Sequence, residues 1–234
     1  MTMTEEVPTL FTVWNTPVKV KPAVLVNLLV AWSALSWLAG QQLPESSWPA
    51  RLLVGALSTT ALLAADLGHT LAHVVSARYA GAPMDAILVS MGMPRTLYFD
   101  NEVPPRTHRM RALGGPIYNA LGLLASLFLR MLTSYGSPAR LVADWSCIGH
   151  GMILAGSITP LPLVDGGTIL KWTLVERGRT PAQADAVIRR LNLVIGAIAV
   201  TAGVVLVLLH YWLPALGLAA AGAIAIGAAL GKIR

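Results

Sequence analysis

The chain has 234 residues, of which 55% are hydrophobic and only 12% are charged, and its mean hydropathy is +0.65. Soluble domains carry about 25% charged residues, so this composition excludes an ordinary soluble protein and indicates a bilayer as the solvent. The formal charge of +6 comes without any basic run interleaved with aromatic residues. We therefore interpret the basic residues as membrane-surface anchors and expect no nucleic-acid partner.

Six apolar segments are near or above the length of about 20 residues that a helix needs to cross the hydrocarbon. In chain order they cover residues 23–40, 52–80, 110–132, 141–163, 191–212 and 213–230. They predict an all-α integral membrane protein of about six transmembrane helices. We expect a single membrane domain over residues 1–234, with an N-terminal leader at 1–22 and a C-terminal helix pair at 191–230.

The basic residues also predict the orientation of these helices. If the N-terminus is cytoplasmic, all but three of the 17 lysine and arginine residues fall on the cytoplasmic side, the exceptions being Arg51, Arg130 and Arg140. Basic loops stay in the cytoplasm. We therefore predict a multi-pass protein with both termini cytoplasmic, because an odd number of spans would spoil this segregation.

Two further segments do not have the character of spans. Residues 84–99 contain short β-prone pieces interrupted at Gly92 and Pro94, which predicts a small β-hairpin or a re-entrant segment. Residues 180–190 begin with Thr180 at an N-cap position and Pro181 at the first helical position. They predict a surface helix that leads into the fifth span.

Four polar residues mark one side of the second span. At 100° per residue, Asp66, His69, Thr70 and His73 fall within an arc of about 100°. A polar stripe on an apolar helix must face protein or water. The i, i+4 spacing of the two histidines suits a metal, although the same spacing also arises by chance in purely structural roles.

A carboxylate follows the fourth span, after Pro160 and Pro162 have broken the helix. Asp165 stands there, before Gly166 and Gly167, which permit close backbone approach. The segment could be a helix-terminating loop in which Asp165 caps the next helix. The predicted topology nevertheless places Asp165 at a membrane depth similar to that of the two histidines.

Three segments in this order resemble the site-2 protease family of intramembrane zinc metalloproteases, over about residues 52–170. They are His69-Thr70-Leu71-Ala72-His73, with a glycine eight residues after its second histidine, then Gly114-Gly115-Pro116-Ile117-Tyr118-Asn119, and finally Pro160 to Gly167. Two residues depart from the family pattern, because Thr70 stands in place of the motif glutamate and Ser157 in place of an asparagine. A register that puts Asp66 in the glutamate position loses the first histidine.

The resemblance implies zinc held by His69, His73 and Asp165, and a membrane-embedded protein substrate cut near the cytoplasmic face. It implies that a glutamate acts as general base, so Thr70 predicts impaired catalysis because a hydroxyl is far too weak a base. Asp66 would then support His69 or serve as a displaced base. Asn119 would line the substrate site, and the segment at 84–99 would present a substrate strand.

Two other functions fit the same residues. A pseudoprotease would have the same fold, with or without zinc, and would bind transmembrane partners without cutting them. A haem-binding electron carrier could use paired histidines, since the predicted spans contain His69, His73, His150 and His210. In the protease interpretation His150 lies about four helical turns from Asp165, so we give it no role at the metal.

Overall fold

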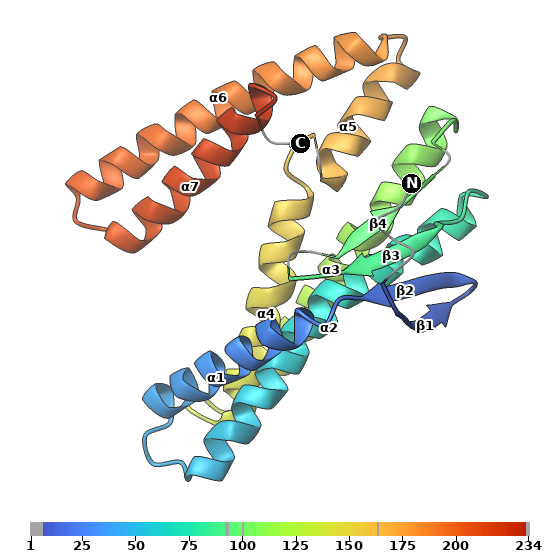
Figure 1. The fold of residues 1–234 in the computed structure, drawn as a ribbon. Helices are drawn as coiled ribbons and strands as arrows, with labels where there is room; N and C mark the ends of the chain where they lie inside the picture. The colour runs from blue at the N-terminus through green and yellow to red at the C-terminus, as the bar shows by residue number, and fades with distance from the viewer. Residues whose placement is uncertain (1–6, 92–93, 100, 163, 233–234) are drawn as a thin grey trace. The chain divides into compact units, whose positions relative to one another are not determined.

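The computed structural model describes residues 7–91, 94–99, 101–162 and 164–232 (Figure 1). Within these residues it is mostly helical, with one small sheet. The strands are β1 (Thr9–Val13), β2 (Thr16–Val20), β3 (Ala86–Val89) and β4 (Arg95–Leu97). The helices are α1 (Val24–Gln42), α2 (Trp48–Tyr79), α3 (Pro105–Leu132), α4 (Pro138–Ser157), α5 (Asp165–Glu176), α6 (Pro181–Leu208) and α7 (Trp212–Ala229).

The chain divides into two compact units, which we describe separately. The first comprises Met1–Val103 and Met110–Gly156, and so contains the sheet, α1, α2, nearly all of α4 and most of α3. The second comprises Pro104–Arg109 and Ser157–Arg234, and so contains α5, α6, α7 and the start of α3. The predicted grouping of the whole chain into one membrane domain stays a prediction.

Four helices of the described residues, α1, α2, α3 and α6, are long and apolar enough to cross a membrane. A shorter apolar helix covers Pro214–Ala229. These helices confirm an integral membrane protein. The predicted total of six spans, and the cytoplasmic placement of both termini, stay predictions.

The sheet contains more of the chain than the sequence predicted. Its strands lie in the order β1-β2-β3-β4, with β1–β2 and β3–β4 antiparallel and β2–β3 parallel. The hairpin predicted within residues 84–99 is confirmed as β3–β4. Within the predicted leader, β1 and β2 form a second hairpin, whose turn at Trp14 and Asn15 has φ values of 46° and 67°, as a tight turn between twisted strands requires. An all-α class with one hairpin was therefore too narrow.

The sheet packs against α2 within the first unit. Val18 on β2 and Ile87 on β3 are fully buried and cluster with Val74 and Ala77 of α2. Thr16 donates a hydrogen bond to the carbonyl of Met84, 3.1 Å away. Helices α1 and α2 form the whole connection between the parallel strands β2 and β3 (Figure 1). The chain thus leaves the sheet along α1 and returns to it along α2.

Helix α2 ends just before Gly81, the glycine eight residues after His73. Gly81 has a φ of 72°, its N–H bonds to the carbonyl of Arg78, and the N–H of Ala82 bonds to the carbonyl of Ala77. This pattern closes a helix with a left-handed residue, which glycine adopts without steric cost. The end of the helix therefore explains why glycine stands at position 81, without any role in catalysis or metal binding.

The second unit corrects one prediction about residues 180–190. Thr180 does cap a helix, with the reciprocal hydrogen bonds to Gln183 that define a capping box. That helix is not a separate surface element, since α6 runs unbroken from Pro181 to Leu208. The sequence contains no helix breaker between the polar first turns and the apolar remainder, so one helix includes both.

Helices α6 and α7 lie side by side in the second unit (Figure 1). They approach closely at two small residues. A Cβ built on Gly196 would lie 2.9 Å from the carbonyl oxygen of Gly222, and a Cβ built on Gly222 would lie 2.9 Å from that of Gly196. Small residues at such crossings let apolar helices pack without a hydrophobic driving force between them.

Candidate metal centre

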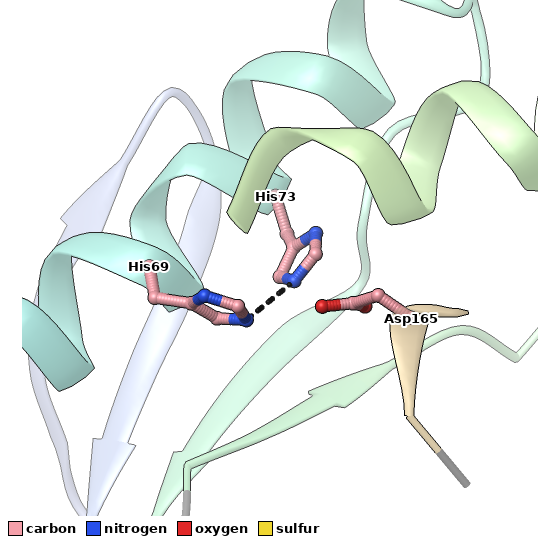
Figure 2. Close-up of side chains that lie close together, drawn as sticks. All are labelled: His69, His73 and Asp165. Atoms are coloured by element: carbon pink, nitrogen blue, oxygen red, sulfur yellow. Dashed lines mark hydrogen bonds between the residues drawn. The ribbon is translucent and has the colours of Figure 1, made fainter. Parts of the chain in front are cut away.

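Two buried histidines of α2 meet at their outer ring nitrogens. The Nε2 atoms of His69 and His73 are 3.1 Å apart, joined by a hydrogen bond, and the rings meet edge to face at a centroid distance of 4.8 Å (Figure 2). Both side chains are 6% exposed. The i, i+4 spacing thus brings the two imidazoles together as the sequence predicted.

The inner nitrogen of His73 faces an atom that can only accept a hydrogen bond. Nδ1 of His73 lies 2.8 Å from the carbonyl oxygen of Arg111 on α3. The Nδ1–H must therefore donate, and in the neutral ring Nε2 then carries the lone pair. Ser76 donates to the same carbonyl over 2.9 Å. The backbone of α3 thus fixes the tautomer and the ring orientation of His73, so that its Nε2 lone pair faces His69.

The inner nitrogen of His69 faces an amide. Nδ2 of Asn119 lies 2.8 Å from Nδ1 of His69 and donates to it. The other end of this amide, Oδ1, accepts from Nδ1 of His150 on α4, also over 2.8 Å. With its Nδ1 accepting, His69 carries its proton on Nε2 and donates to His73. Three imidazoles and one fully buried amide therefore form one network inside the first unit.

Glycines make this approach of helices possible. A Cβ built on Gly115 would lie 2.4 Å from Nε2 of His69 and 2.5 Å from Nε2 of His73. A Cβ on Gly114 would lie 2.3 Å from the carbonyl oxygen of Ala72. The glycine pair that precedes Pro116 is thus needed where α3 crosses α2. Gly115 in particular leaves open the space in front of both ring nitrogens.

The histidine pair fits a metal ion. Two nitrogens bound to one tetrahedral zinc ion at about 2.0–2.1 Å lie about 3.3 Å apart, and the observed separation of the Nε2 atoms is 3.1 Å. The hydrogen bonds at the inner nitrogens, to a carbonyl oxygen and to an amide, are the kind of partner that orients ligating histidines. The space kept free by Gly115 adjoins both Nε2 atoms.

Thr70, at the position of the family glutamate, is turned into its own helix. Its Oγ1 donates to the carbonyl oxygen of Asp66 over 3.1 Å, and the side chain is 3% exposed. This is the i−4 bond by which a threonine hydroxyl satisfies itself inside a helix. The hydroxyl therefore acts as a donor here. The roles predicted for Asp66, in support of His69 or as a displaced base, stay predictions.

Asp165 belongs to the second unit, where it is the first residue of α5. The turn before it packs tightly on the first turn of α5, since a Cβ on Gly166 would lie 2.3 Å from the carbonyl oxygen of Ile158. Nδ2 of Asn192, on α6, donates to the carbonyl oxygen of Pro160 over 2.7 Å. Asn192 is 1% exposed, so a buried amide anchors the segment that carries the carboxylate.

Sequence reasoning missed two of these residues. The sequence gives His150 no role at the metal because it lies about four turns from Asp165 along the chain, whereas in the structure its partner is Asn119 on α3. Asn192 was not singled out at all. The same feature of the sequence could have identified both residues, because each is a polar side chain inside an apolar helix.

Comparisons with known proteins bear on the fold. The sequence matches no protein-family model, and no curated protein matches it either. The structure is similar to that of "Site-2 Protease from Methanocaldococcus jannaschii", with a TM-score of 0.55 over 97% of this chain and 95% of that one, at 14% sequence identity. A likeness at this identity concerns the fold, and the chain has a site-2-protease-like fold.

Proposed function

From this fold we propose that the chain is a site-2-protease-like intramembrane zinc metallopeptidase whose catalysis is impaired. The observation that carries the proposal is the buried pair His69 and His73, whose Nε2 atoms converge in front of a glycine. Its substrates would be membrane-embedded proteins, approached near the cytoplasmic face. The impairment follows from Thr70, which replaces the general base that the reaction needs.

The proposed zinc ligands are Nε2 of His69, Nε2 of His73 and a carboxylate oxygen of Asp165. The two histidines belong to the first unit (Figure 2), and the motif resemblance adds Asp165, the first residue of α5 in the second unit. Two neutral imidazoles and one carboxylate, with a position left open, are the donor set of many catalytic zinc sites. This supports zinc as the ion.

A zinc ion at this position would supply Lewis acidity, which polarises a carbonyl and makes water more acidic. The chain's own residues must then remove the proton of the attacking water. General acid–base help is worth about 10²- to 10⁴-fold in rate. Because Thr70 donates its hydroxyl proton to the carbonyl of Asp66, it offers no basic group for this task.

A substrate would be held as an added strand. In the sheet order β1-β2-β3-β4, strand β4 pairs with β3 alone among the described strands, so its other edge has no partner strand among them. An extended peptide can add to such an edge through main-chain hydrogen bonds. Asn119 is proposed to act at the same site, chiefly through the orientation of His69. Both termini are proposed to be cytoplasmic, as the distribution of basic residues suggests.

A pseudoprotease is the second candidate, and one observation favours it. Thr70 is buried, and its hydroxyl group already donates a hydrogen bond within α2. The helix is therefore regular at the position of the general base, but the side chain there is not basic. Such a protein would bind transmembrane partners without cutting them. Haem is less well supported, since Nε2 of His69 and Nε2 of His73 are hydrogen-bonded to each other at 3.1 Å, which leaves no room for a macrocycle between them.

Zinc content of the detergent-purified protein tests the site. We expect one zinc per chain in the wild type and none in His69→Ala. His210→Asn is the matched control, because His210 is exposed at the end of α6 and its φ of 63° suits asparagine. A wild type without zinc, or a His69→Ala variant that keeps it, contradicts the metallopeptidase.

The Thr70→Glu variant separates the two candidates. Glutamate would restore a base, while Thr70→Gln adds a side chain of the same size without basicity. We expect zinc-loaded Thr70→Glu to cut a panel of single-span membrane peptides in mass-spectrometric assays, and Thr70→Gln and the wild type to cut at least 10²-fold more slowly. If none of the three cuts while all bind zinc, the pseudoprotease is the better description.

A further inference from the structure

The amide of Asn119 joins two histidines that the proposed chemistry treats differently. On one side it contacts His69, a proposed zinc ligand, and on the other it contacts His150, which lies on α4 and is not a proposed ligand. Asn119 is fully buried and His150 is 7% exposed. A Cβ built on Gly122 would lie 2.2 Å from Cε1 of His150, so α3 leaves room for this particular ring.

The hydrogen-bond directions fix where the ring protons lie. Asn119 donates through Nδ2 to Nδ1 of His69, and accepts through Oδ1 from Nδ1 of His150. His69 thus carries its proton on Nε2, and His150 carries its proton on Nδ1. His73 differs, because the carbonyl of Arg111 already holds its proton on Nδ1. Of the two histidines among the proposed ligands, only His73 presents its Nε2 lone pair to a metal in this arrangement.

Metal binding would reverse the hydrogen bonds of His69. A metal takes the Nε2 lone pair, so the neutral ring must carry its proton on Nδ1. That Nδ1–H would then point at the Nδ2–H₂ group of Asn119, and two donors 2.8 Å apart repel each other. A half-turn of the amide about its last torsion angle exchanges Nδ2 and Oδ1 with little change of shape. Oδ1 of Asn119 can then accept from His69.

The same half-turn changes what His150 meets. After it, Nδ2 of Asn119 faces Nδ1 of His150, and this nitrogen must now accept. Neutral imidazole can do so by carrying its proton on Nε2 instead. Each ring keeps one proton throughout, so no net charge changes in the buried network. Only the positions of the protons and the direction of two hydrogen bonds are exchanged.

We propose that Asn119 and His150 are positioning residues for His69, and that binding of zinc at His69 reverses the Asn119 amide and moves the His150 ring proton from Nδ1 to Nε2. This inference rests on the proposed function, since it takes His69 as a ligand. It assigns to α4 a group that reports the state of the metal site without contacting the metal.

The test is nitrogen NMR of the detergent-purified full chain labelled with ¹⁵N-histidine, first stripped by chelation and then titrated with zinc. The spectrum of a His150→Gln variant identifies the His150 signals. We expect Nδ1 of His150 to change from the N–H class to the lone-pair class as one zinc per chain is bound. His73 is expected to keep its Nδ1–H class, and exposed His210 serves as the internal reference.

Two variants of Asn119 distinguish positioning from packing. Asn119→Asp has the same shape but can only accept, so it satisfies zinc-bound His69 and cannot donate to His150. It should still bind one zinc per chain, while His150 keeps its Nδ1–H with or without zinc. Asn119→Leu should weaken zinc binding by about 10- to 100-fold, as measured by chelator competition.

The outcomes separate this inference from the proposed function. One zinc per chain in the wild type with an unchanged His150 spectrum overturns the inference and leaves the metal site standing. A His150 response that persists in Asn119→Asp overturns it as well. A wild type that binds no zinc overturns the metal site and, with it, the role of Asn119.

Discussion

Replacing Gly115 by alanine adds a single methyl group in front of both ligating nitrogens. The new Cβ would lie 2.4 Å from Nε2 of His69 and 2.5 Å from Nε2 of His73, whereas ordinary contacts begin at 3.4 Å. The rings or the helix must therefore move by about 1 Å. Metal–ligand distances tolerate changes of only about 0.2 Å, so we expect Gly115→Ala to lose its zinc on chromatography in detergent.

The stability of this variant should fall less than its metal affinity. Overpacking costs about 1–3 kcal/mol, and the better helix propensity of alanine returns about 0.5–1 kcal/mol. Gly151→Ala on α4 is the matched control, because the nearest side chain that its Cβ would meet is a flexible methyl group of Leu123, 3.8 Å away. Zinc content and thermal unfolding are measured together. Gly115→Ala with one zinc per chain would refute the assignment of this space to a metal.

Three substitutions outside the histidine network probe how the two units are built. Asn192→Leu removes the hydrogen bond to the carbonyl oxygen of Pro160, so we expect the free energy of unfolding to fall by about 1–3 kcal/mol. We also expect weaker zinc binding, measured by chelator competition. Unchanged zinc affinity would show that this hydrogen bond does not support the metal site. Thr180→Ala breaks the capping box and should lower the unfolding temperature by an amount equivalent to about 1 kcal/mol, with zinc content unaffected. Gly81→Ala imposes a φ of 72° on alanine and should cost about 1 kcal/mol, which Gly81→Asn should largely recover; equal stability of all three forms would contradict the left-handed cap.

Features that depend on neighbouring residues could be predicted from the sequence. The meeting of His69 and His73 follows from helical periodicity alone. The cap at Thr180 follows from its distance to Gln183. The β3–β4 hairpin follows from β-prone pieces around Gly92 and Pro94. In each case the partners lie within a few turns or one hairpin of one another, so local rules suffice.

Features that depend on the register between distant elements could not be predicted. The bond between Asn119 and His150 requires the relative height of α3 and α4, which no local pattern encodes. The same holds for Asn192 and Pro160, which are 32 residues apart. The β1–β2 hairpin could not be predicted for another reason. Its strands are five residues long, β1 is almost wholly exposed, and β2 pairs with β3, which lies far along the chain.

The parallel pairing of β2 with β3 has a consequence for how the protein assembles in a membrane. Thr16 and Met84 are 68 residues apart in the sequence and are joined by a hydrogen bond. The segment between them contains two candidate membrane spans, α1 and α2. During synthesis, β2 and β3 cannot pair until α2 has been inserted. Only then does the C-terminal end of α2 lie on the same side of the membrane as β2. Completion of the sheet would thus act as a checkpoint on insertion, because a chain with only one of the two helices inserted would leave β2 and β3 on opposite sides of the bilayer.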